Sequence, residues 1–125
     1  MWERFFDKAE IFGVDIYDKT QLQEGRKKIK QGSQVDASFL ESLSDEVGGF
    51  DLIIDDGSHL NEHIICTFEI LFPKLNDNGI YVIEDVQTSY WPEFGGDSIN
   101  SDSEWTAMGN FKKLIHGLNH AEFRN

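Results

Sequence analysis

Two acidic pairs and one histidine are the residues of this sequence with the clearest chemical potential. One apolar run ends in Asp55 and Asp56, and a second ends in Glu84 and Asp85. His59 follows Asp56 by three positions, across a Gly-Ser pair. Carboxylate oxygens are the ligands that Mg²⁺ prefers, and an imidazole is a suitable general base near neutral pH. The pattern therefore indicates a divalent metal site with a base beside it.

The charge around these acids favours the same interpretation. Four carboxylates at neighbouring strand ends cannot all stay ionised unless a cation lies among them. Lys74 is the only lysine or arginine between Phe50 and Met108, so few fixed cations are at hand. The alternative is that the acids are solvated loop residues or helix caps. Similarly, His59 taken alone could simply lie in the first turn of a helix.

A strand–helix–strand unit is expected to bring the two acidic pairs together. Residues 50–55 and 80–85 are continuous apolar runs, as strands buried on both faces should be. Residues 59–75 have apolar side chains at helical spacing, with Ser58 as the expected N-cap and residues 76–79 as a turn. This unit predicts an α/β fold with a Rossmann-like parallel sheet, whose ligands bind at the carboxyl ends of the strands.

The remaining sequence fits one domain over residues 1–125. We expect a short helix in 1–9, a strand ending near Asp15, and a mixed segment, helical at first, with a strand near Ile29. A helix should run from the cap Asp36 to Gly48. A long polar loop follows Asp85, which often signals function. The last helix should turn five apolar residues inward: Trp105, Met108, Phe111, Ile115 and Leu118.

Composition narrows the class of partner. The net charge of −12 argues against nucleic acid and against anionic membranes, which both need a basic surface. The apolar runs are all shorter than the ~18 residues of a membrane span. Cys66 is the only cysteine and cannot form an internal disulfide, so we expect a cytoplasmic protein.

Two motifs resemble a known enzyme family. The stretches DDGSH at 55–59 and EDVQTSYW at 84–91 are similar to segments of class I methyltransferases that use S-adenosylmethionine. Within that class they look most like the metal-dependent sugar O-methyltransferases of macrolide biosynthesis, the mycinamicin and macrocin type. The resemblance implies Mg²⁺ or Mn²⁺, S-adenosylmethionine, and an acceptor that is a small glycosylated molecule.

The resemblance also implies a role for individual residues. Asp56, Glu84 and Asp85 match the metal ligands, and His59 matches the catalytic base. Three further residues match the cofactor site: Asp15 at the ribose hydroxyls, Gln34 beside the adenine, and Asp55. Tyr90 and Trp91 fall where the substrate loop begins, and simple packing is the equal alternative for both.

The resemblance is incomplete at the start of the chain. The family's first strand carries a glycine-rich loop, and residues 1–50 contain no match to it. The last strands of the fold have no match either. The resemblance thus implies part of a methyltransferase domain, whose exposed apolar edge would favour a homo-oligomer.

Two other classes of protein compete with this interpretation. A receiver domain has a phosphorylated aspartate after an apolar strand, but it needs a lysine where this chain has Glu84 and Asp85. A non-catalytic methyltransferase remnant that acts as an assembly subunit would explain the missing glycine loop.

Overall fold

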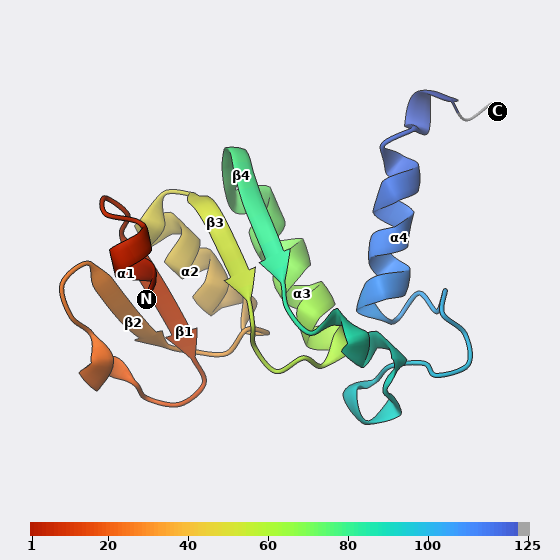
Figure 1. Ribbon diagram of the computed structural model, residues 1–125, viewed down its shortest axis with the longest axis horizontal. Helices are drawn as coiled ribbons and strands as arrows, with labels where there is room; N and C mark the ends of the chain where they lie inside the picture. The colour runs from red at the N-terminus through yellow and green to blue at the C-terminus, as the bar shows by residue number, and fades with distance from the viewer. Residues whose placement is uncertain (123–125) are drawn as a thin grey trace.

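The computed structural model describes residues 1–122, and its helices and strands alternate along the chain (Figure 1). The longer elements, in chain order, are α1 (Trp2–Phe5), β1 (Ile11–Asp15), β2 (Lys27–Gln31), α2 (Ala37–Val47), β3 (Phe50–Asp55), α3 (Asn61–Leu71), β4 (Leu75–Ile83) and α4 (Ala107–Gly117). Short 3-10 helices join several of them: η1 (Thr20–Leu22), η2 (Phe72–Lys74), η3 (Val86–Tyr90), η4 (Pro92–Phe94) and η5 (His120–Glu122). The described helices include none that is long and apolar enough to cross a membrane.

The four strands form two separate parallel pairs. β1 pairs with β2, and β3 pairs with β4. All four arrows point the same way in Figure 1, so the carboxyl ends of the strands lie on one side of the molecule. The expectation of parallel strands in an α/β fold is confirmed. The strands are not one continuous sheet, however, because β1 and β3 do not pair.

The unit β3–α3–β4 matches the expected strand–helix–strand arrangement, with two corrections. First, α3 begins at Asn61, so the N-cap is Leu60 and not Ser58. The Ser58 hydroxyl instead accepts the Leu60 N–H at 3.3 Å and bonds to His63 Nδ1 at 2.8 Å. The turn after β3 is therefore longer than the sequence pattern predicts.

The second correction concerns residues 76–79, which lie inside β4 and not in a turn before it. The register moves from Phe50 with Leu75 to Leu52 with Ile80, so β4 bulges between these pairs. Asn78 has a φ of 66°, a left-handed backbone that asparagine tolerates well. The same residues that favour a turn thus form an irregular strand.

The helix α2 has the ends that the sequence predicts. The Asp36 carboxylate accepts the Phe39 N–H at 3.0 Å, and Gly48 ends the helix in the left-handed conformation with a φ of 81°. Leu40 and Leu43 are both buried. Residues 20–22, by contrast, form only a short 3-10 helix.

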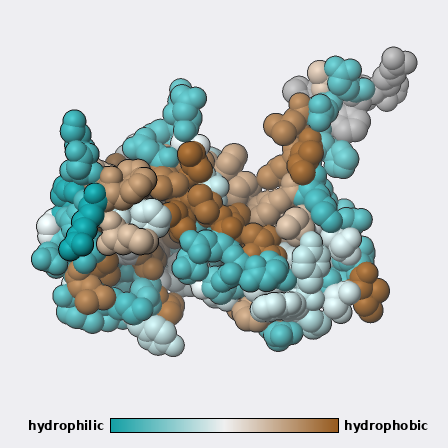
Figure 2. Space-filling model, viewed as in Figure 1, coloured by the Kyte–Doolittle hydropathy of each residue, from teal (hydrophilic) through white to brown (hydrophobic). Residues whose placement is uncertain are grey.

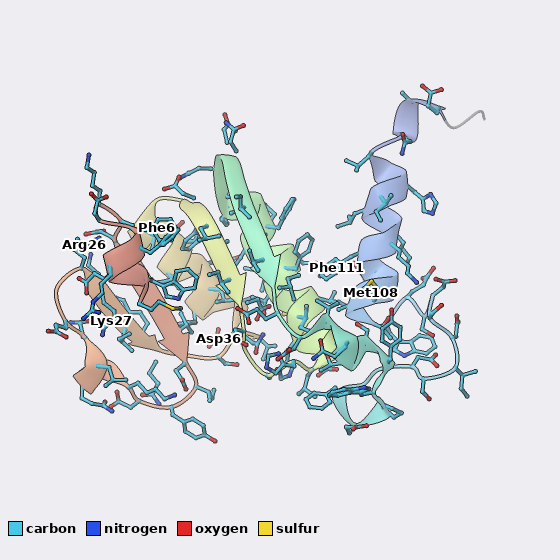
Figure 3. The ribbon with its side chains drawn as sticks, viewed as in Figure 1. Phe6, Arg26, Lys27, Asp36, Met108 and Phe111 are labelled. Atoms are coloured by element: carbon cyan, nitrogen blue, oxygen red, sulfur yellow. The ribbon has the colours of Figure 1, made fainter. Side chains whose placement is uncertain are left out.

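Arg26 ties the short helix α1 to the start of β2 (Figure 3). Its guanidinium donates to the backbone carbonyls of Phe6, Ala9 and Glu3, and its backbone N–H donates to the Glu3 carboxylate at 2.8 Å. A four-residue helix has little stability of its own. The bonds from Arg26 therefore hold α1 against the start of β2.

One face of the β3–β4 pair is apolar and uncovered. Tyr81 points to the side of α3, where its ring meets Phe68 with centroids 5.2 Å apart. Its neighbours Ile80 and Val82 point to the other side and are 60% and 38% exposed. Figure 2 shows hydrophobic surface gathered over this part of the molecule. The expectation that both faces of these strands are buried is wrong for this chain, since helices cover one face only.

The last helix is only partly inward-facing. Phe111 points toward α3 in Figure 3, and its ring lies 4.9 Å from that of Phe68. Trp105, Ile115 and Leu118 were expected inward but are 63%, 62% and 82% exposed. The helix leaves the body of the molecule after its first turns (Figure 1), so its far half has no neighbour to pack on.

A buried amide holds the long segment between β4 and α4 in place. Asn61 is 1% exposed, and its Nδ2 donates to the carbonyls of Thr88 and Phe94. Its Oδ1 accepts from the Ser89 hydroxyl and the Ala107 N–H. All hydrogen-bonding capacity of this side chain is used. One residue at the start of α3 thus fixes both η3 and the start of α4.

Asn61→Ala should lower the free energy of unfolding by roughly 3 kcal/mol, because it leaves several buried polar groups without partners. The control is Asn76→Ala, since the part of the chain that the structure describes gives that exposed amide one side-chain hydrogen bond, to Asp51, and its loss should matter little. Urea denaturation of both variants measures the difference. Equal stability of the two variants would contradict the role given to Asn61.

The Asp97 carboxylate organises the turn before α4, and this predicts a pH effect. It accepts from the N–H groups of Asn100 and Ile99 and from the Ser103 hydroxyl, which hold its pKa below the usual 3.8. A depressed pKa means that the stabilisation is present above pH 3.8 and is lost as the pH falls further. As the pH falls below 3.8, the free energy of unfolding should therefore decrease less steeply for Asp97→Asn than for wild type. Acid titration of both proteins measures this slope, and Asp77→Asn is the control.

Candidate functional site

Three of the predicted site residues converge at the carboxyl ends of β3 and β4. One ligating atom from each of Asp56, His59 and Asp85 lies within 4.8 Å of the other two. His59 Nε2 is 3.7 Å from Asp56 Oδ1 and 3.7 Å from Asp85 Oδ2. The His59 side chain is 25% exposed, while both carboxylates are more than half exposed. The cluster is open to solvent on its acidic side.

The backbone at this cluster is strained at two points. His59 has a φ of 59° and Asp85 a φ of 53°, both in the left-handed region. Such residues cost free energy and persist only where the surrounding structure holds them. Asp85 is held because its carbonyl accepts the Thr88 N–H at 3.1 Å and the Thr88 hydroxyl at 3.0 Å. The long segment fixed by Asn61 thus sets the position of Asp85.

Glu84 lies apart from this cluster. Its backbone N–H donates to the Asp55 carbonyl at 2.9 Å, which continues the β3–β4 pairing, and its exposed side chain does not join the group of three. It lines the neighbouring cleft together with Asp56. The structure therefore brings together two of the three predicted metal ligands with the predicted base.

Gln34 and Asp55 form a network beneath the cluster. Gln34 Oε1 accepts the Ser58 N–H at 2.7 Å, and Nε2 donates to Thr67 Oγ1 at 3.1 Å and Asp55 Oδ1 at 3.3 Å. Burial raises the pKa of Asp55, with only partial compensation from the Gly57 N–H and from His59. Gln34 thus holds the turn that carries Asp56 and His59.

A large cleft runs between the two strand pairs, with a volume of about 1430 Å³. Its walls include every residue of β1 and β3, together with some residues of α2 and α3. Five of the predicted residues line it near the carboxyl ends of the strands: Asp15, Gln34, Asp55, Asp56 and Glu84. Asp55 Oδ2 is buried there and has no hydrogen-bond partner among the described residues.

Asp15 ends β1 at the far side of the cleft, as the sequence predicts. Its carboxylate bonds to Lys19 Nζ at 2.6 Å and accepts the Tyr17 N–H at 2.9 Å. These contacts, with Lys19 first, lower the pKa of Asp15, so the group is ionised at neutral pH. It remains an acceptor at the edge of the cleft.

Tyr90 and Trp91 are 39% and 44% exposed, and neither lines the large cleft or the smaller hollow of about 510 Å³ near Phe94. This hollow is lined by Phe94 and Trp105, with Leu60 and Glu62 opposite. No motif or period in the sequence points to Phe94, Glu62 or Asn61 as site residues. The only available signal was the unusual length of the segment that follows Asp85.

The known proteins to which this chain is similar are O-methyltransferases. No family model matches the chain. The tetracenomycin-C rhamnosyl 2'-O-methyltransferase of Streptomyces olivaceus is 45% identical over 123 residues. The mycinamicin VI 2''-O-methyltransferase of Micromonospora griseorubida is 44% identical over 122 residues. In both cases the match covers 98% of this chain, but only 32% and 31% of the relative.

Solved structures agree with these relatives. The mycinamycin pathway methyltransferase MycE in complex with Mg and SAH matches 99% of this chain with a TM-score of 0.95 at 43% identity. Its complex with Mg, SAH and mycinamycin VI matches 95% of this chain with a TM-score of 0.91. The chain spans 32% of that protein.

The receiver-domain and assembly-subunit interpretations have no support from these matches. The resemblance inferred from DDGSH and EDVQTSYW is confirmed, and so is the class of fold. The chain is a homologue of the sugar O-methyltransferases of macrolide and related polyketide pathways, and corresponds to about a third of their length.

Proposed function

We propose that this chain carries the metal and base half of a site for methyl transfer from S-adenosylmethionine to a sugar hydroxyl of a small glycosylated molecule. The observation that supports this most directly is the convergence of Asp56, His59 and Asp85 within 4.8 Å. An acceptor of this kind suits the net charge of −12 better than a nucleic acid does.

The donor set fits Mg²⁺, or its relative Mn²⁺. Asp56 and Asp85 offer exposed carboxylate oxygens within the cluster. Glu84 directly precedes Asp85 in the chain, and its side chain, outside the cluster here, would have to turn toward the ion to bind it. We assign these three as ligands, because a hard cation prefers oxygen donors and compensates their negative charge. When bound, Mg²⁺ would lower the pKa of a sugar hydroxyl and orient it.

The cleft fits the cofactor. Asp55 Oδ2 is buried and has no hydrogen-bond partner within residues 1–122, so it is an acceptor that a donor group of a ligand would satisfy. Asp15 offers an ionised carboxylate across the cleft for ribose hydroxyls, and Gln34 holds the wall between them. S-adenosylmethionine supplies an electrophilic methyl group when bound.

His59 acts as the general base. Its Nε2 faces the two carboxylates at 3.7 Å, too long for direct hydrogen bonds. Nε2 would accept the proton of the sugar hydroxyl as its oxygen bonds to the methyl carbon, while the bond from that carbon to the cofactor sulfur would break and S-adenosylhomocysteine would leave. Tyr90 and Trp91 are then part of the loop that meets the acceptor.

Residues 1–125 form a single partial domain that contributes to this site. The uncovered face of β3 and β4 favours a homo-oligomer. Ile80 and Val82 present apolar surface that a monomer would leave in water. Burying this surface against another copy or another part of a longer chain would stabilise the unit.

Asp56→Asn and Asp85→Asn should each weaken Mg²⁺ binding at least about 10-fold, because each removes a charged ligand. Calorimetric titration with Mg²⁺ and the EPR signal of free Mn²⁺ give two independent readouts. Asp51→Asn is the control, since that carboxylate bonds only to Asn76. Unchanged metal binding in both site variants would refute the metal assignment.

His59→Asn should keep cofactor and metal binding but lose about 10²-fold to 10⁴-fold in turnover, the usual contribution of a general base. Asparagine is chosen because it accepts the left-handed backbone at this position. Methyl transfer to a glycosylated acceptor is measured in single turnovers. Turnover close to wild type would remove His59 as the base.

A further inference from the structure

A closed ring of hydrogen bonds surrounds the turn that carries His59. Gln34 Oε1 accepts the Ser58 N–H at 2.7 Å, and the Ser58 hydroxyl bonds to His63 Nδ1 at 2.8 Å. The Thr67 hydroxyl donates to the His63 carbonyl at 2.8 Å and accepts from Gln34 Nε2 at 3.1 Å. The ring thus joins the segment after β2 and the turn after β3 to the first two turns of α3 (Figure 1).

The ring holds both neighbours of His59 in the chain. The Ser58 hydroxyl accepts the Leu60 N–H at 3.3 Å, and the Leu60 carbonyl accepts the His63 N–H at 2.9 Å. His59 itself has a φ of 59°, which a residue other than glycine keeps only where its surroundings hold it. The bonds to Ser58 and Leu60 therefore oppose the relaxation of this backbone.

The direction of the bond between Ser58 and His63 follows from the other contacts of each side chain. The Ser58 oxygen already accepts from Leu60, so its proton is available to His63 Nδ1. Glu62 Oε1 lies 3.7 Å from His63 Nε2, on the opposite edge of the ring. This arrangement favours the tautomer that carries its proton on Nε2 and accepts at Nδ1. The imidazole of His63 is then a positioned acceptor for one hydroxyl.

The position of His59 depends on this turn more than on contacts of its own Nε2. That atom is 3.7 Å from the carboxylates of Asp56 and Asp85, which is beyond hydrogen-bond range. The ring beneath it is better shielded, since Thr67 is 5% exposed and the side chain of His63 is 24% exposed. Hydrogen bonds that are linked and partly shielded from water strengthen one another.

We propose that Ser58 and His63 are positioning residues for the base His59. Their bond holds the left-handed turn that directs the His59 imidazole toward the acidic cluster. This role rests on the proposed methyl-transfer function, because that function is what requires a base at His59. A misplacement of about 1 Å in a reacting group can cost on the order of 10²-fold in rate. Loss of the bond should therefore slow the reaction and leave ligand binding intact.

The test is a double-mutant cycle with Ser58→Ala, His63→Ala and the variant that carries both. His63→Asn is the conservative variant, because the amide of asparagine can take the place of Nδ1. His116→Ala is the control, since this histidine is exposed on α4 and lines neither cavity. The single-turnover rate is measured with S-adenosylmethionine and 8-demethyl-8-α-L-rhamnosyl tetracenomycin C, the acceptor in the name of one relative. Calorimetric titration gives the affinities for Mg²⁺ and S-adenosylmethionine.

Each single alanine variant should lose about 10-fold to 10²-fold in rate, and the double variant should lose no more than the slower single variant. His63→Asn should recover most of the rate, and His116→Ala should match wild type. Both affinities should stay within about 2-fold of wild type, as expected for residues that act only on the reaction. A wild-type rate in His63→Ala, additive losses, or a loss of S-adenosylmethionine binding that accounts for the slower rate would each overturn the proposal.

Hydrogen exchange separates this proposal from the methyl-transfer function, because it needs neither acceptor nor cofactor. NMR measures the exchange rate of the Ser58 N–H, which donates to Gln34. Exchange should be faster in His63→Ala than in wild type and His116→Ala, and an equal rate in all three would contradict the ring. If wild type transfers no methyl group, the proposed function fails, and hydrogen exchange alone decides whether Ser58 and His63 hold this turn.

Discussion

The candidate site depends on one buried side chain, the amide of Asn61. Its four hydrogen bonds join the first turn of α3 to Thr88, Ser89, Phe94 and Ala107. Thr88 in turn bonds to the carbonyl of Asp85, so the amide positions one side of the acidic cluster. The Phe94 bond positions the aromatic wall of the hollow. A buried amide that is fully satisfied specifies one arrangement, since any other would leave its donors and acceptors unpaired. The acidic cluster and the hollow lined by Phe94 are therefore positioned by the same residue.

Elements with local signals were predictable from the sequence, and elements that depend on distant neighbours were not. The cap of Asp36 and the left-handed Gly48 need only nearby residues, and both are where the sequence places them. The pairing of Asp56, His59 and Asp85 followed from parallel strands whose carboxyl ends share an edge. In contrast, the burial of Asn61 depends on a segment some thirty residues away, to which no sequence period points. The prediction for the far half of α4 was wrong because an amphipathic pattern identifies only which face of a helix is apolar. It does not show whether another element of this chain packs on that face.

The two left-handed residues show how the site differs from an ordinary acidic surface. Surface carboxylates usually occupy relaxed backbone and move freely, but Asp85 is held at a φ of 53° by the turn that follows. His59 is held at 59° between Gly57–Ser58 and the start of α3. This strain is offset by bonds elsewhere, from Gln34 to Ser58 and from Thr88 to Asp85. The side chains of Asp56, His59 and Asp85 are thus held by the backbone around them, which would reduce the ordering cost of binding the proposed ion.

The division of the strands into two pairs has a consequence for how the chain folds. β1 and β2 are separated by a short connection, and β3 and β4 by a single helix, so each pair joins segments that are close in the sequence. Closing short loops costs little entropy, and a chain of low contact order folds fast. Because no hydrogen-bonded ladder joins β1 to β3, each pair can form without waiting for the other. Each half of the structure can thus form from segments that are close in the sequence.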